Sequence, residues 1–245
     1  MKEKILKNLI REINNKGDIE LENASNYIEL VLIYRSRKYL REIDSSDYVK
    51  AFWEELYEDI PERADTILNV VNPLKAFSIY RLKQLGGNKY PFVQINGNWR
   101  LKKELFRIIL ENLNGIFNGF SELRELFERL SEIAYSLANF MPAPIGYNGT
   151  SVSFGKGSYH ENNDYPFFYY MNLLDGKDDK SLKWLNSVWE LYDIQELFEI
   201  RPPFLDPDYY FELKDYNELE RYLRQCIEGI ENRAQLLEER MNNSK

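Results

Sequence analysis

The sequence predicts a mainly α-helical protein: a single-domain bundle of helices with one small β-hairpin near residues 91–101 and a long irregular loop over residues 141–166. Three observations predict this class. Hydrophobic residues make up 44% of the 245 residues, apolar positions recur every three or four residues, and strand-like alternation is clearest around Asn96-Gly97. Because no repeat or low-complexity linker divides the chain, residues 1–245 are expected to form one domain, with 201–216 as its weakest seam.

The N-terminal part is expected to hold three helices. Residues 2–14 have helical apolar spacing before Gly17, and residues 25–42 are expected to form one long helix. Within the latter, the unbroken apolar run ending at Tyr34 is also compatible with a buried strand. Residues 45–47 (Ser-Ser-Asp) offer an N-cap for the third helix, which carries Trp53.

The middle of the chain is expected to alternate short helices with the one hairpin. Pro61 opens a short helix to about residue 71, and Asn72-Pro73 starts a second that ends at Gly86-Gly87. The hairpin of residues 91–101 leads into a helix over 101–118. A further helix over 122–140 stops before a proline.

Residues 141–166, here the 141–166 segment, hold three of the nine prolines and four of the twelve glycines and show no helical period. Irregular stretches of this length in compact domains are usually functional or disordered, and the aromatic content of this one argues against disorder. Helices are then expected over 166–174, 181–199 and 217–241. The apolar stripe of the last one is Leu219, Tyr222, Leu223, Cys226, Ile227, Ile230, Leu237 and Met241.

The scarcity of cysteine and histidine excludes several chemistries. One cysteine, Cys226, permits no intramolecular disulfide, which fits a reducing cytosol and a cytoplasmic location. One histidine, His160, cannot supply a Cys/His structural zinc site or a helical di-iron site, so no metal and no cofactor are expected. Glu122, Glu125 and Glu128 could hold a hard cation, but the arginines among them favour an ordinary charged surface.

Charge and hydropathy limit the partners. The net charge is −8, and residues 186–245 carry 7 basic against 14 acidic side chains, so duplex nucleic acid is disfavoured as a partner. No apolar run is long enough to cross a membrane, and charges interrupt the first residues, which predict an amphipathic helix rather than a signal peptide. The expected partner is a protein or a small molecule.

The candidate ligand-binding residues lie in and beside the 141–166 segment. Lys156 between two glycines could contact an anion, although its spacing departs from that of a phosphate loop. His160 could act as a base oriented by Glu161 or Asp164; the alternative is a solvated loop in which Asp164 caps the next helix. The full candidate set is Asn139, Asn148, Lys156, Tyr159, His160, Glu161 and Asp164. Alternatively, the two asparagines simply satisfy carbonyl groups at the end of the preceding helix.

A short resemblance accompanies these residues. The stretch Ile-Ala-Tyr-Ser-Leu-Ala-Asn-Phe-Met-Pro from Ile133, then Asn-Gly-Thr-Ser-Val-Ser-Phe-Gly-Lys-Gly, then Asp164 before an aromatic helix, resembles a bacterial protein family without an established activity. The resemblance therefore implies no catalytic role. Residues 137–142 are also similar to a stretch of HNH-type nuclease domains, but the histidines such nucleases need upstream are absent here.

Two functions remain open at this point. No complete catalytic constellation is present, which favours a non-catalytic binding or interaction module that uses the 141–166 segment. The alternative is a hydrolase or transferase that acts on a small polar or phosphorylated ligand at the same segment, with Lys156 as the anion contact and His160 as the base.

Overall fold

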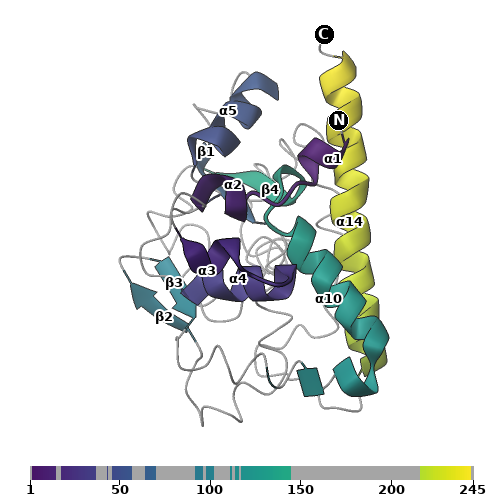
Figure 1. Ribbon diagram of the computed structural model, residues 1–245. Coiled ribbons are helices and arrows are strands. Elements are labelled where there is room, and N and C mark those ends of the chain that lie inside the picture. Colours follow the sequence, from purple (N-terminus) through teal and green to yellow (C-terminus); the bar gives the residue numbers. More distant parts are fainter. Residues whose placement is uncertain are drawn as a thin grey trace, which may run out of the picture.

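The computed structural model describes residues 2–14, 18–36, 43, 46–56, 64–69, 92–95, 98–101, 111, 114–115, 117–144 and 216–243. Within these ranges the chain is mainly helical, which confirms the mainly α-helical part of the predicted fold class (Figure 1). The helices are α1 Lys2–Ile5, α2 Ile10–Asn14, α3 Ile19–Glu22, α4 Tyr27–Ser36, α5 Asp47–Leu56, α10 Ser121–Ile133, the 3₁₀ turn η1 Leu137–Asn139 and α14 Tyr216–Asn243. The strands are β1 Ala64–Asn69, β2 Phe92–Ile95, β3 Asn98–Leu101 and β4 Phe140–Pro144.

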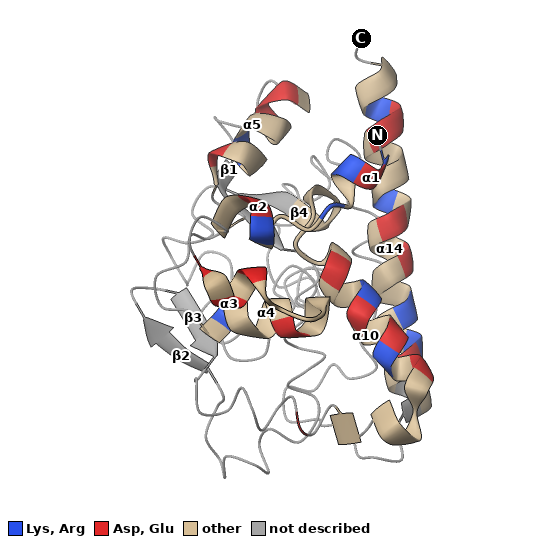
Figure 2. Cartoon of the chain, in the orientation of Figure 1, with Lys and Arg blue, Asp and Glu red and all other residues tan. Residues whose placement is uncertain are grey.

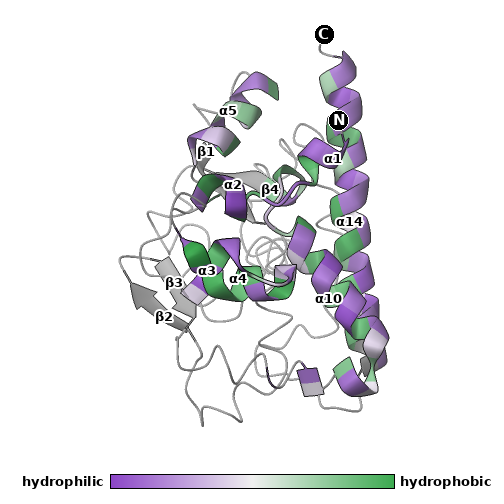
Figure 3. Cartoon of the chain, in the orientation of Figure 1, coloured by the Kyte–Doolittle hydropathy of each residue, from purple (hydrophilic) through white to green (hydrophobic). Residues whose placement is uncertain are grey.

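Helix α4 lies in the core and is buried on nearly all sides. The five consecutive residues 30–34 are buried, which only an element apolar on every face can tolerate. Figure 3 shows the same helix coloured mainly as hydrophobic. The Oδ1 atom of Asn26 accepts the backbone N–H of Glu29 at 2.8 Å and so caps the start of the helix. The run that was compatible with a strand is therefore helical, as predicted.

The longest element, α14, runs along one side of the molecule beside α1 and α10 (Figure 1). Its 28 residues span about 42 Å at 1.5 Å per residue. The predicted range 217–241 agrees with the observed helix to within two residues. The fully buried members of its stripe are Leu219, Leu223, Cys226, Ile230, Ala234 and Leu237. Helix α10 contacts both α14 and α4 and buries Leu123, Phe127, Leu130 and Ile133.

Two antiparallel strand pairs accompany the helices. In the first, Phe92 lies opposite Leu101 and Ile95 opposite Asn98, so β2 and β3 stand where the sequence predicts a two-stranded ribbon. The Asn96-Gly97 connection lies outside the described residues. In the second pair, Asn69 lies opposite Phe140, and the ladder continues to Ala64 opposite Pro144 with one irregularity.

The second pair, β1 with β4, corrects three predictions. The short helix expected from Pro61 to about residue 71 is wrong, because residues 64–69 form β1. The helix expected over 122–140 ends at Ile133, and the 141–166 segment begins in β4 rather than in irregular structure. At residues 64–69, helical spacing was overridden by pairing with β4, a segment more than seventy residues away in the chain.

The N-terminal helix is also corrected. The continuous helix expected over 2–14 is broken between Ile5 and Ile10, giving α1 and α2. The break places the backbone N–H of Leu9 against the carbonyl of Tyr135 at 3.0 Å. The expected helices over 72–86, 166–174 and 181–199, and all of the seam at 201–216 except its last residue, lie outside the described residues and stay predictions.

Candidate functional site

Of the seven candidate ligand-binding residues, the structure describes Asn139. The other six (Asn148, Lys156, Tyr159, His160, Glu161 and Asp164) lie outside the described residues, so their roles stay predictions. What the structure does describe is the place where the 141–166 segment leaves the packed helices α4, α10 and α14, here called the helical body. That place is the buried turn of residues 134–140 together with the first residues of β4.

The 134–140 turn is a stretch inside the core that is not α-helical. All seven of its residues are buried, and five of them have no exposed surface. Buried carbonyl groups need hydrogen-bond donors, because an unsatisfied one costs about 1–3 kcal/mol. Donors within the turn serve four carbonyl groups: the Ser136 N–H binds that of Ile133, the Asn139 side chain that of Ala134, the Asn139 N–H that of Ser136, and the Phe140 N–H that of Leu137. Donors from elsewhere serve three more: the Leu9 N–H binds the carbonyl of Tyr135, and Arg233 Nη1 binds those of Ala138 and Phe140.

Asn139 holds the turn closed. Its side-chain amide donates to the carbonyl of Ala134 at 2.7 Å, and its backbone N–H donates to Ser136 at 3.1 Å. The side chain has no exposed surface. These contacts match the alternative that the sequence left open, in which this asparagine satisfies a carbonyl at the end of the preceding helix.

Arg233 of α14 fixes the outgoing end of the turn. Its Nη1 donates to the carbonyl of Ala138 and, at 2.7 Å, to the carbonyl of Phe140. The side chain is 0% exposed. Hydrogen bonds in which the donor carries a charge are stronger than neutral ones, and a guanidinium is the cation best suited to burial. One buried side chain from a distant helix therefore sets the position of the first residue of β4.

The ring of Trp53 completes this arrangement. The guanidinium carbon of Arg233 lies 5.0 Å from the centre of the Trp53 ring, which is the geometry of a cation–π contact. Trp53 comes from α5 and has no exposed surface. The contacts of Arg233 with Ala138, Phe140 and Trp53, here the Arg233 anchor, thus join α14, α5 and the start of β4.

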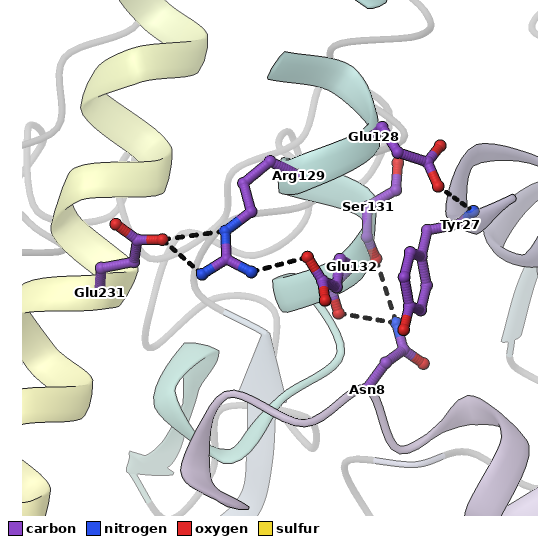
Figure 4. Close-up of polar contacts among 7 residues, drawn as sticks. All are labelled: Asn8, Tyr27, Glu128, Arg129, Ser131, Glu132 and Glu231. Atoms are coloured by element: carbon purple, nitrogen blue, oxygen red, sulfur yellow. Dashed lines mark hydrogen bonds and ion pairs between the residues drawn. The ribbon is translucent and has the colours of Figure 1, made fainter. Parts of the chain in front are cut away.

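A second group of polar contacts joins α14 to the body at its edge (Figure 4). Arg129 of α10 bridges to Glu231 of α14, with Nε 2.9 Å from Oε1, and to Glu132 on its own helix. The Arg129 and Glu231 side chains are 37% and 34% exposed. Burial opposes the charge on Arg129, but the hydrogen bonds to both glutamates outweigh it and raise the guanidinium pKa.

The C-terminal half of α10 takes part in two caps that join it to other segments (Figure 4). Asn8 Nδ2 donates to the carbonyls of Ser131 and Glu132 in the last turn of α10, at 3.1 and 2.9 Å. Glu128 accepts the backbone N–H groups of Tyr27 and Ile28, the first turn of α4. A carboxylate at that position satisfies orphan donors and opposes the positive end of the helix dipole. Glu128 is thus committed to a structural role rather than to a cation.

Arg233 and Asn8 are the residues that sequence reasoning missed. A signal for Arg233 was present, since it stands three residues after Ile230 and four before Leu237, on the apolar stripe of α14. A charged residue at such a position predicts a buried side chain that is paired with polar groups of other segments. For Asn8 no local signal exists, because its two acceptors are more than 120 residues away.

The polar contacts named above hold backbone segments of the described region in position. It contains no group of three or more His, Cys, Asp or Glu side chains that could hold a metal ion. The hydroxyls of Ser131 and Ser136 are buried and have no hydrogen-bond partner, but no described histidine accompanies them as a base. Figure 2 shows residues of both charge signs along α10 and α14. Within the described ranges, every helix is too short or too polar to cross a membrane.

Comparison of the chain with protein families, with curated proteins and with solved structures found no match.

Proposed function

We propose that the protein is a binding or interaction module without catalytic activity and that the 141–166 segment makes its contacts. The observation that carries the proposal is the Arg233 anchor, whose hydrogen bond to the Phe140 carbonyl measures 2.7 Å. A binding segment works best when a rigid scaffold holds its ends, because less conformational freedom is then lost on association. The anchor gives the N-terminal end of the segment such a fixed origin.

The composition of the segment supports the same proposal. It carries Tyr147, Phe154, Tyr159 and Tyr165 among small and polar residues. Aromatic side chains bring a large contact area with few rotatable bonds and are enriched at interfaces. By contrast, the whole chain offers one histidine and one cysteine for catalysis, and Cys226 is buried in the stripe of α14.

The test places a photo-crosslinking residue, p-benzoylphenylalanine, at Tyr147 or Tyr159 in cells that express the protein. The control position is Tyr48 on α5, which is 41% exposed. We expect discrete crosslinked products from both segment positions and none from Tyr48. Equal products from all three positions, or none at all, would contradict the proposal.

A second measurement separates binding from catalysis. Wild type and His160→Ala are assayed with p-nitrophenyl phosphate and p-nitrophenyl acetate. We expect no turnover by either protein, and a change in the free energy of unfolding within about 0.5 kcal/mol, as for ordinary surface sites. Turnover that His160→Ala abolishes while its circular dichroism is unchanged would instead establish a hydrolase at this segment.

A further inference from the structure

The strand pair β1–β4 is too small to be stable by itself. An isolated two-stranded ribbon is marginal in water at best and needs packing against other elements. Two of the five residues in β4 are prolines, Pro142 and Pro144, which have no N–H to donate to a ladder. The ladder also has an irregularity between Ala64 and Thr66. The ribbon therefore depends on whatever joins it to the helical body.

The described tie between ribbon and body passes through the Arg233 anchor. Phe140 is the first residue of β4, is fully buried, and pairs with Asn69 at the end of β1. Its carbonyl is held by Arg233, which is itself held against Trp53. Loss of the guanidinium would leave the carbonyls of Ala138 and Phe140 buried without this donor.

Helices α4, α10 and α14 are also held together by contacts that do not involve Arg233. Arg129 joins α10 to Glu231 of α14, and Glu128 caps α4. The apolar stripes of α10 and α14 face one another, and the N-terminal Asn8 binds the end of α10. The body can accordingly keep its structure when the ribbon separates from it.

From this arrangement we infer that the Arg233 anchor is a conformational latch. Breaking it opens the β1–β4 ribbon as a unit, whereas α4, α10 and α14 stay folded. Because the 141–166 segment begins in β4, the opening changes the position from which that segment starts. The consequence for binding rests on the proposed function, but the opening itself does not.

The test is native-state hydrogen exchange at several urea concentrations below the unfolding transition, followed by mass spectrometry or NMR. In the wild type, we expect the amides of β1 and of Met141 to exchange at least about tenfold faster than the core amides of α4, a factor equal to about 1.4 kcal/mol. Their urea dependence should also be smaller, because the opening exposes less surface than global unfolding.

Variants then test whether the Arg233 anchor controls the opening of the ribbon. Arg233→Lys keeps the charge but loses the planar fork, and we expect it to speed ribbon exchange by about tenfold or more. Arg129→Met is the matched control on α10 and should leave ribbon exchange within about twofold. Trp53→Phe keeps an aromatic ring and weakens the cation–π contact, so a smaller increase in the same amides is expected.

Two outcomes would overturn the latch. One is that ribbon and α4 amides share one rate and one urea dependence, so that the protein opens only as a whole. The other is that Arg129→Met speeds ribbon exchange as much as Arg233→Lys does. Crosslinking at Tyr159 is measured separately. If the ribbon opens as expected but no crosslinks form, the latch is supported and the proposed function is contradicted.

Discussion

Arg233 and Arg129 both join α14 to other parts of the described structure, and they differ in what surrounds them. Arg233 is 0% exposed, donates to two backbone carbonyls and lies over an indole ring. Arg129 is 37% exposed and pairs with two carboxylates at the edge of the helix interface. Judged by formal charge alone, Arg129 has the stronger partners, because carboxylates are charged and the backbone carbonyls bound by Arg233 are neutral. By burial, Arg233 is expected to contribute more to stability, because water replaces lost contacts at an edge but not in a core.

The comparison predicts that effects on stability follow burial rather than formal charge pairing. The largest effect is expected for Arg233→Met, which leaves the carbonyls of Ala138 and Phe140 without their donor and removes the contact with Trp53. The free energy of unfolding should fall by about 3 kcal/mol, measured by urea denaturation. A loss below about 1 kcal/mol would show that the buried contacts contribute no more than a surface pair.

Asn8 is the next test, since its side chain is buried but neutral. Asn8→Ala removes the donor for the carbonyls of Ser131 and Glu132 and the acceptor for the N–H of Ile10. We expect a loss of about 1–2 kcal/mol, measured by thermal and urea denaturation. Asn8→Asp, which keeps an acceptor but places a negative charge at the C-terminal end of α10, should be at least as damaging. Asn8→Asp as stable as the wild type would contradict the cap.

Glu128 tests a part-buried cap. Glu128→Ala removes the acceptor for the first turn of α4, and we expect a loss of about 1 kcal/mol in unfolding free energy. Glu125→Ala, an exposed position on the same helix, is the matched control and should change stability by less than about 0.5 kcal/mol. Equal effects in the two variants would mean that the carboxylate of Glu128 does not stabilise α4.

The smallest effect is expected at Arg129, which is only part-buried. Arg129→Met should lower the free energy of unfolding by no more than about 1 kcal/mol. Because exposed ion pairs are screened, the difference from wild type should shrink between low salt and about 1 M salt. The loss in Arg233→Met should change much less over the same range. A salt-independent loss in Arg129→Met would contradict an electrostatic origin.

The sequence predicts the parts of this fold that follow from local patterns. The stripe from Leu219 to Leu237 marks α14 almost to its ends, and the apolar run before Ser36 marks a buried helix. Helical spacing also marks the region of α10. In each of these elements the residues that determine the structure lie within a few turns of one another.

The remaining features depend on partners that are distant in the chain. No local pattern predicts that α10 ends at Ile133. The turn that follows is stabilised by Leu9 and Arg233, which are distant in the chain. For the same reason the helical spacing of residues 64–69 gives way to pairing with β4. A cation on the apolar stripe of α14 was the one visible sign of the buried turn.

The most direct test of the account measures the two guanidinium groups in one protein. Side-chain NMR of the arginine N–H groups, assigned with Arg233→Lys and Arg129→Lys, reports how fast each exchanges its hydrogens with water. We expect slow exchange at Arg233, which is buried and bonded to the carbonyls of Ala138 and Phe140, and fast exchange at Arg129. Exchange at Arg233 as fast as at Arg129 would show that no buried anchor holds the start of β4.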